Sequence, residues 1–376
     1  MYLRSLTLTG FRNLVDTALE VPREGVAIIG RNAQGKTNLL EAIQYLETFR
    51  SFRAARDEQL VRFGGNVFRI VADLASTGGG GPRAPRITAA YDAGTRAKKV
   101  TVDGEEVERL GDAIGRVGAV LFTPEDVRLI TDGPQERRRF LDVMLSLNAS
   151  EYLASLQRFR HVLSQRNAAL RDRAPSEVVG AWDQPLVQSG AEVSWERATW
   201  LRELGGTFAE RYREISDGVP AHVVYESSIP DVAEKKSVDE VAQEYRDALL
   251  RSREREASRR TTVVGPHRDE LRFFHDGDGD AMDLRDFGSG GQRRTAALTL
   301  RLLEVETVRR RRGREPILLL DDVFAELDEG RSARVLDLLD RVVRGQVLLT
   351  APKESDVRFR GDTLARWTIE QGRVDA

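Results

Sequence analysis

The feature that most constrains this chain is a short glycine-containing loop between an apolar run and a helical pattern. Residues 30–37 read Gly-Arg-Asn-Ala-Gln-Gly-Lys-Thr and fit the pattern G-x-x-x-x-G-K-[ST]. Residues 26–29 form a buried-strand run, and residues 38–49 alternate apolar and polar positions as a helix does. Glycines let backbone N–H groups curl around an anion, and a helix start adds free N–H groups and a positive dipole end. The loop therefore predicts a phosphate-binding site.

Positions in this loop have expected roles in holding ATP. We expect Lys36 to reach the β- and γ-phosphates, and the Thr37 hydroxyl to be a ligand of Mg²⁺. ATP and Mg²⁺ are thus the expected cofactors. The loop residues expected to bind the nucleotide are Gly30, Arg31, Asn32, Ala33, Gln34, Gly35, Lys36 and Thr37.

Composition narrows the class of protein. A chain of 376 residues is long enough for two or three domains. Its net charge of −2 means that any DNA-binding surface must be a local basic patch. The absence of cysteine excludes disulfides and thiolate metal sites. No apolar run approaches the roughly 18–20 residues needed to span a bilayer, and the first residues lack a signal peptide's apolar region. We therefore expect a soluble cytoplasmic protein with no membrane partner.

The order of patterns along the chain predicts a head interrupted by a helical insertion. Strand patterns occupy residues 2–9 and much of 67–122, where a glycine-rich loop at 77–82 and an Asp103-Gly104 hairpin turn separate them. Long helical patterns fill residues 125–260. Strands are expected again at 261–264, 271–275, 317–320 and 346–350, with helices between the later ones. We predict an α/β head made of residues 1–124 and 261–376, and a helical lobe of residues 125–260.

Two acids follow the apolar strand at residues 317–320. In a parallel sheet, the strand would deliver Asp321 to the edge where the phosphate loop lies, and Asp321 could hold Mg²⁺. Asp322 points elsewhere, so we predict that it orients the attacking water and is catalytic together with Lys36. Most ATPases of this architecture place a longer Glu there, so we expect slow hydrolysis. A helix-capping Asp after a buried strand is the alternative.

A second anion-binding element is expected far along the chain, at Ser289, Gly290, Gly291 and Gln292. A serine and paired glycines before a helix offer a hydroxyl, free N–H groups and a dipole. One protomer has no need of two clamps on one γ-phosphate, so we predict that this element acts in trans on ATP held by a second copy. Asp328, just beyond the Mg²⁺ strand, should lie at the same homodimer interface.

Two basic clusters are candidates for contacts with DNA. One is Arg50, Arg53 and Arg56 after the first helix, and the other is Arg137, Arg138 and Arg139 in the insertion. A solvated helix end explains the first cluster equally well. A charged helix face is the more common explanation of the second.

Taken in order, these motifs resemble the RecF family of recombination mediators, within the SMC and ABC-type ATPase superfamily. The resemblance is carried by residues 8–13, 30–41, 50–53, 137–142, 265–269 (Gly-Pro-His-Arg-Asp), 289–293 and 319–328. It implies an ABC/SMC-type ATPase head with a mixed sheet and a mainly helical second lobe with a short coiled arm. It also adds Arg12, Asn13 and Asn38 to the nucleotide site.

The resemblance further implies a function and partners. These are weak, DNA-stimulated ATP hydrolysis, an ATP-dependent homodimer, and binding to double-stranded or gapped DNA. The expected protein partners are RecR with RecO and, indirectly, RecA, in DNA replication, recombination, repair of DNA damage and the SOS response.

Departures from the superfamily leave alternatives open. ABC ATPases usually have a switch His after the last core strand, whereas this strand ends Leu349-Thr350-Ala351-Pro352. The glutamine loop is unassigned, since Gln135 is equally well a surface residue. An ATPase subunit of a membrane transporter would share the phosphate loop, but the long helical insertion, residues 265–269 and the missing His count against it. The insertion is too short for the coiled arms of a structural SMC protein. A small-molecule kinase is excluded more weakly, by the absence from the sequence of any evident pocket for a phosphate acceptor.

Overall fold

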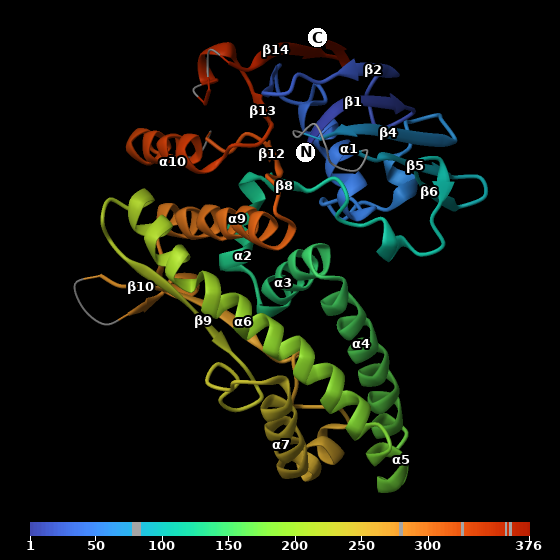
Figure 1. Ribbon diagram of the computed structural model, residues 1–376, viewed down its shortest axis with the longest axis vertical. Helices are drawn as coiled ribbons and strands as arrows, with labels where there is room; N and C mark the ends of the chain where they lie inside the picture. Colours follow the sequence, from blue (N-terminus) through green and yellow to red (C-terminus); the bar gives the residue numbers. More distant parts are fainter. Residues whose placement is uncertain (77–83, 278–280, 325–326, 358, 361–362) are drawn as a thin grey trace. The chain divides into compact units, whose positions relative to one another are not determined.

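The computed structural model describes residues 1–76, 84–277, 281–324, 327–357, 359–360 and 363–376. They fold into two compact units, one of residues 1–126 and 304–376 and one of residues 127–303 (Figure 1). The predicted loop at 77–82 lies outside the described residues, as do Ala325 and Glu326 of the segment 319–328.

The first unit contains an antiparallel sheet of order β2-β1-β4-β5-β6-β7. Its strands are β1 (Tyr2–Thr9), β2 (Thr17–Glu20), β4 (Val67–Ala75), β5 (Arg86–Asp92), β6 (Ala97–Val102) and β7 (Glu105–Glu106). Asp103 and Gly104 join β6 to β7 with φ of 54° and 91°. Positive φ at both central residues is typical of a tight hairpin turn, so the predicted hairpin is confirmed.

A second sheet of the first unit has the order β15-β14-β3-β13-β12-β8. Its strands are β3 (Gly25–Ile29), β8 (Ala119–Phe122), β12 (Ile317–Leu320), β13 (Val347–Ala351), β14 (Ala365–Glu370) and β15 (Arg373–Asp375). All neighbours are parallel except β14 and β15. Every residue of β8, β12 and β13 is buried, as expected for strands covered on both faces. Strand β13 lies between β3 and β12, so the ends of all three strands meet at one edge.

Helix α1 (Lys36–Thr48) is the centre of the first unit. It contacts β4 and β5 of the antiparallel sheet and β8 and β13 of the parallel sheet, and Figure 1 shows it beside β4 and β5. Its apolar residues Leu39, Leu40, Ile43 and Leu46 are fully buried. Because both sheets pack on α1, the loop that begins this helix is attached to an element held from two sides. Helix α10 (Glu329–Val342) and 3₁₀ turns at Asp57–Leu60, Leu110–Asp112, Pro124–Val127 and Glu354–Asp356 complete this unit.

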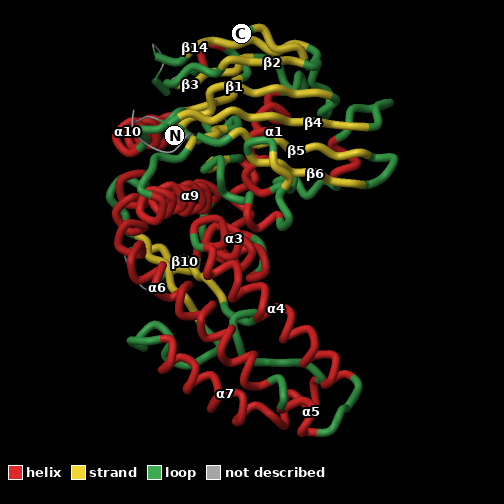
Figure 2. The backbone as a smooth tube through the Cα atoms, turned by 45° about the vertical axis from the view of Figure 1, so that its right-hand side comes forward, coloured by secondary structure: helices red, strands yellow, loops and turns green. Residues whose placement is uncertain are grey.

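The second unit is mainly helical, and its long helices α4, α6 and α7 are seen in Figure 2. Helix α6 packs against both α4 and α7, and α3 packs against α4. The helices are α2 (Arg128–Thr131), α3 (Pro134–Asn148), α4 (Ser150–Arg171), α5 (Ser176–Gly180), α6 (Asp183–Ile215), α7 (Val238–Arg259), α8 (Leu284–Phe287) and the first part of α9 (Gly290–Arg312). The long helical patterns predicted for residues 125–260 correspond to α3, α4, α6 and α7.

The second unit also contains a three-stranded sheet, in which β10 (Glu270–His275) lies between β9 (Ala221–Glu226) and β11 (Met282–Asp283). Strand β9 was not predicted, and the predicted strand at 261–264 is wrong. Residues 262–264 are buried, but the N–H groups of Thr262 and Val263 donate to the side chains of Asn167 and Glu256 rather than to a neighbouring strand.

Residues 261–303, which we predicted as part of the head, pack in the second unit. The reason is the pairing of β10 with β9 along the full length of both strands. The functional division at residues 124 and 260 stays a proposal.

Candidate nucleotide site

The glycine-containing loop has a backbone that depends on glycine at two places. Gly35 has a φ of 118°, in the region that favours glycine. A Cβ on Gly30 would lie 2.5 Å from the carbonyl oxygen of Ile369 in β14. The turn between β14 and β15 also holds Gln34, whose carbonyl oxygen and Oε1 accept from the N–H groups of Gly372 (2.9 Å) and Gln371 (2.6 Å). Strand β14 and the turn that follows it thus fix the position of the loop.

Side chains of the loop and of β12 meet at one edge of the parallel sheet. Lys36 Nζ folds back over the loop and donates to the carbonyl oxygens of Gly30 (2.6 Å) and Arg31 (3.2 Å). Thr37 Oγ1 donates to Asp321 Oδ1 at 3.0 Å, although the two residues are 284 positions apart. A cation, a hydroxyl and a carboxylate are therefore placed together where the sequence predicted them.

Thr350 on β13 is a member of this group that sequence reasoning missed. Its hydroxyl donates to Asp321 Oδ1 at 2.9 Å and accepts from the N–H of Asp322 at 3.0 Å. Burial raises the pKa of Asp321, and the hydrogen bonds from Thr350 and Thr37 oppose that rise. A single polar residue in the otherwise apolar strand β13 was the available signal, but only the pairing of β13 with β12 shows what the residue contacts.

Asp322 has an uncommon conformation beside Asp321. Its φ is 46°, which few non-glycine residues adopt. Its Oδ1 is buried without a hydrogen-bond partner among the described residues. Burial raises the pKa of Asp322, the charge of Lys36 lowers it, and the charge of Asp356 raises it. Since an unpaired buried carboxylate oxygen is costly, this atom has capacity for a further donor.

The residues present fit the predicted Mg²⁺. The Thr37 hydroxyl and the Asp321 carboxylate are hard oxygen donors within hydrogen-bond distance of each other, as this ion prefers. Within the described ranges, no group of three or more His, Asp or Glu side chains could hold a metal without other ligands. A cation at Thr37 and Asp321 would therefore be completed by nucleotide phosphates and water.

The side chains that the resemblance added to the site are tied to α1. Arg12 forms a bidentate ion pair with the fully buried Glu41, through Nε at 2.9 Å and Nη2 at 3.0 Å. Asn38 Nδ2 donates to Asn13 Oδ1 at 2.7 Å, and Arg53 donates to Asn38 Oδ1 at 3.1 Å. These side chains are held by one another beside the first turn of α1, and a cavity of about 610 Å³ borders Arg12, Asn13 and Asn38.

The predicted trans element begins α9 in the second unit. Gln292 N–H donates to Ser289 Oγ (3.2 Å), and Ser289 N–H donates to Gln292 Oε1 (2.7 Å), which is a reciprocal cap of the helix start. Ser289 and Gly290 are exposed, and Gly291 is half-buried. Asp328 caps another helix, since its side chain accepts from the N–H of Arg331 at the start of α10. A role of either residue at a dimer interface stays a prediction.

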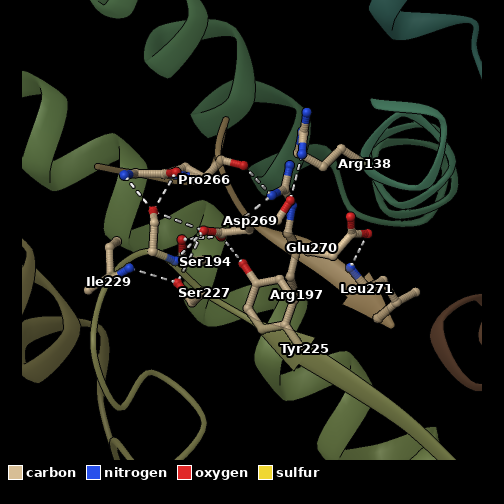
Figure 3. Close-up of polar contacts among 12 residues, drawn as sticks. Arg138, Ser194, Arg197, Tyr225, Ser227, Ile229, Pro266, Asp269, Glu270 and Leu271 are labelled. Carbon is tan, nitrogen blue, oxygen red and sulfur yellow. Dashed lines mark hydrogen bonds and ion pairs between the residues drawn. The ribbon is translucent and has the colours of Figure 1, made fainter. Parts of the chain in front are cut away.

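The Gly-Pro-His-Arg-Asp segment ends in a buried polar network of the second unit (Figure 3). The side chain of Asp269 is fully buried, accepts from Ser228 N–H at 2.8 Å and from the Tyr225 hydroxyl, and lies 3.7 Å from Arg197. Arg138 donates to the Asp269 carbonyl oxygen at 2.7 Å. These contacts join α3, α6, β9 and β10, so the segment that carried much of the resemblance has a structural role here.

The structure corrects one of the predicted DNA contacts. Arg137 is almost fully buried, pairs with Glu270 at 2.6 Å and donates to three carbonyl oxygens, so it is not available to a DNA phosphate. Arg138 is half-buried and Arg139 is exposed. The cluster after α1 is exposed at all three positions, Arg50, Arg53 and Arg56. Gln135 is an exposed residue of α3, so its role in a glutamine loop is unassigned.

In the part of the chain that the structure describes, no helix has the length and apolar character of a membrane span.

Comparisons with known proteins agree with this geometry over nearly the whole chain. A family model described as "RecF/RecN/SMC N terminal domain" matches residues 2–375. The DNA replication and repair protein RecF of Halothermothrix orenii is 35% identical over 357 residues, which are 93% of this chain and 92% of that protein. The RecF protein of Halalkalibacterium halodurans is 36% identical over 355 residues, 93% of each chain.

Solved structures are similar as well. A structure of the recombination mediator protein RecF with ATP in the RecFOR pathway is 31% identical, with a TM-score of 0.85 over 100% of this chain and 97% of that chain. An Smc head bound to the C-winged helix domain of ScpA is 16% identical, with a TM-score of 0.59 over 100% and 96% of the chains, and supports the fold alone. The predicted resemblance and fold class are thus confirmed. The chain belongs to the RecF family of DNA replication and repair proteins, within the RecF and SMC group of ATPases.

Proposed function

We propose that this chain is an ATP-dependent, DNA-binding recombination mediator. It binds and slowly hydrolyses ATP with Mg²⁺, dimerises on ATP, and binds duplex DNA near gaps, where it works with RecR and RecO and helps to load the recombinase RecA. The observation that carries the proposal is the meeting of Lys36, Thr37 and Asp321 at one sheet edge. The printed name of a solved relative, a recombination mediator with ATP, supports the same function.

The chemistry follows from the side chains of the site. Lys36 is nearly buried and is held over the loop by two carbonyl oxygens, from which it can move to the β- and γ-phosphates. Mg²⁺, held by Thr37 and Asp321, would neutralise the charge that develops on the phosphates. Asp322 orients the attacking water through its unpaired Oδ1. Because Asp is one methylene shorter than the usual Glu, the water is placed less tightly and hydrolysis is slow.

ATP is proposed to join two copies of the chain. Ser289 and its neighbours present exposed polar groups at the start of α9, while Lys36 serves the loop on its own chain. Since a ligand shifts an equilibrium only by binding one state better, the second clamp supplies the required preference for the dimer. Asp328 is proposed to contact the partner near the same place.

Sedimentation tests the dimer directly. The wild-type chain should sediment as a monomer without nucleotide and as a dimer with ATP and Mg²⁺, and duplex DNA should then sediment with it. The Lys36→Ala variant should remain a monomer and lose hydrolysis by on the order of 10²-fold, the scale for removing an electrostatic stabiliser. Undiminished turnover by purified Lys36→Ala would show that the site is wrongly assigned.

Mixing two defective variants tests the trans clamp. Ser289→Arg should bind ATP as a monomer but neither dimerise nor hydrolyse it. Mixed with Lys36→Ala, it forms pairs in which one composite site has both Lys36 and Ser289 intact, so some hydrolysis should return. Ser289→Arg that hydrolyses ATP normally while sedimenting as a monomer would rule out action in trans.

A further inference from the structure

A cavity of about 480 Å³ lies at the edge of the parallel sheet opposite the phosphate loop. It borders Glu24, Glu315 and Gly345, which come shortly before β3, β12 and β13. Since these strands are parallel, their starts share one edge, and the loop follows β3 at the other edge. The cavity and the proposed ATP site are therefore separated by the length of β3.

The cavity has a rigid wall. Gln346 is 2% exposed, and its side chain accepts from Leu3 N–H (2.8 Å) and donates to the carbonyl oxygens of Leu3 (2.9 Å) and Pro22 (2.7 Å). These three hydrogen bonds join the starts of β1 and β13 to the residues before β3. The main chain around the cavity is thus fixed without any ligand.

Arginine dominates the lining of this cavity. The charged lining side chains are Arg23, Glu24, Arg309, Arg314, Glu315, Arg344 and Arg360. Five cations face two acids, so the lining has an excess of positive charge.

Acids balance the two most buried of these arginines to different degrees. Arg309 is neutralised, because it pairs with Glu306 at 2.8 Å and with both oxygens of Glu315 at 2.9 Å. Arg314 instead donates to the carbonyl oxygens of Gly115 (3.2 Å) and Arg116 (3.1 Å). Burial lowers the pKa of Arg314, the charge of Arg312 lowers it further, and the charge of Glu47 raises it.

The remaining arginines of the lining are Arg23, Arg344 and Arg360. Arg360 donates to the carbonyl oxygens of Gly345 (3.1 Å) and Val343 and lies 3.9 Å from Asp340. Arg23 and Arg344 are exposed and make no hydrogen bond or ion pair within the described ranges. A planar guanidinium fork matches the oxygens of a phosphate better than an ammonium does, and no lysine lines this cavity.

We propose that this cavity is a second anion site, which takes phosphate oxyanions independently of the ATP site. The phosphates come either from a small polyphosphate or from the backbone of DNA. Because the site does not use the phosphate loop, the proposal does not rest on the ATPase function, and it is testable in a chain whose loop is disabled.

The experiment uses the full chain carrying Lys36→Ala. Into this background we place either Arg23→Ala with Arg344→Ala, or the control pair Arg96→Ala with Arg109→Ala. The control removes two exposed arginines of the same unit whose side chains likewise make no hydrogen bond or ion pair among the described residues and do not line the cavity. All four side chains are exposed, so equal melting midpoints should show that each protein folds.

The two sources of phosphate are separated by two probes. Pyrophosphate is titrated by calorimetry at low salt, and a fluorescent duplex is titrated at several salt concentrations. If a small polyphosphate is the ligand, the cavity pair should lose pyrophosphate affinity by about tenfold or more, while the control pair keeps it. If DNA is the source, the cavity pair should reduce the slope of log K against log salt by about 1.8, since each lost phosphate contact accounts for about 0.9. Equal behaviour of the two pairs with both probes would overturn the proposal.

Discussion

Thr350→Val is the sharpest test of how the acids of the nucleotide site are held. Valine has nearly the same shape as threonine but removes both hydrogen bonds of the hydroxyl, the one to Asp321 Oδ1 and the one from Asp322 N–H. A hydrogen bond to a charged group contributes about 1.5–3 kcal/mol, and a buried N–H without an acceptor costs about 1–3 kcal/mol. Thr350 is 5% exposed, so water cannot easily replace the hydroxyl. We expect the free energy of unfolding to fall by about 3 kcal/mol.

The same change should affect turnover more than ATP binding. Lys36 and the loop backbone remain intact, so KM for ATP should change by less than about twofold, whereas kcat should fall by about tenfold to a hundredfold because Asp321 and Asp322 lose their positions. Steady-state ATP hydrolysis and chemical denaturation measure the two effects. Thr350→Ser is the matched control, since it keeps the hydroxyl and should restore most of both. A Thr350→Val protein with wild-type kcat, or a serine variant as defective as valine, would refute the positioning role.

Four further predictions concern Asp321, the basic clusters, the buried Arg137 and a buried histidine. Asp321→Asn should lower hydrolysis by on the order of 10²-fold, because a carboxylate partner of Thr37 and proposed ligand of Mg²⁺ is lost, and a coupled phosphate-release assay measures this. Neutralising Arg50, Arg56 and Arg139 should flatten the salt dependence of DNA binding in an anisotropy assay. Arg137→Ala should instead lower the free energy of unfolding by about 3–5 kcal/mol, because it leaves Glu270 without its ion-pair partner. Burial lowers the pKa of His267 from 6.5 to about 4, so the folded state resists its protonation, and stability should be lost as pH falls from about 6.5 to 4. The loss from this group should be about 3 kcal/mol, and denaturation of His267→Gln should lack it; an unchanged pH slope would contradict the assignment.

Local sequence patterns were sufficient to predict some parts of this structure. The loop at 30–37 and the hairpin at Asp103-Gly104 are specified by backbone conformations that few other residues adopt, so neighbouring letters carry the information. The strand before Asp321 was equally visible, because a strand covered on both faces is apolar throughout. The meeting of Thr37 with Asp321 followed from the rule that parallel strands end at one edge.

Other parts depend on partners that no local pattern reveals. Arg137 lies in a run of three arginines, and only the fold shows that this one is turned inward to Glu270 while Arg139 remains exposed. Residues 261–264 have the composition of a strand, but the N–H groups of Thr262 and Val263 donate to the side chains of Asn167 and Glu256. Thr350 has a role only because β13 lies between β3 and β12. In each case the deciding contact joins residues far apart in the chain or on different elements.

The buried acids of α1 show how such distant contacts prepare the site. Glu41 and Glu47 lie on the helix that begins at Lys36, and both are almost completely buried. A buried carboxylate is costly unless it is paired or hydrogen-bonded, so each of them demands fixed partners. The Glu41 carboxylate accepts hydrogen bonds from Arg12 and from the Ser51 hydroxyl (2.5 Å). The Glu47 carboxylate accepts one from the N–H of Gly118 (2.7 Å), just before β8.

These two groups of contacts act at different points along α1. The contacts of Glu41 bind the flank that carries Arg12 to the first half of the helix, and those of Glu47 bind the end of the helix to the parallel sheet. A shift of α1 along its axis would break both groups at once and leave two charges unpaired in the interior. The position of the backbone at Lys36 and Thr37 is thus set by polar contacts in addition to apolar packing, so ATP binding at the proposed site would require movement of the Lys36 side chain but little movement of α1.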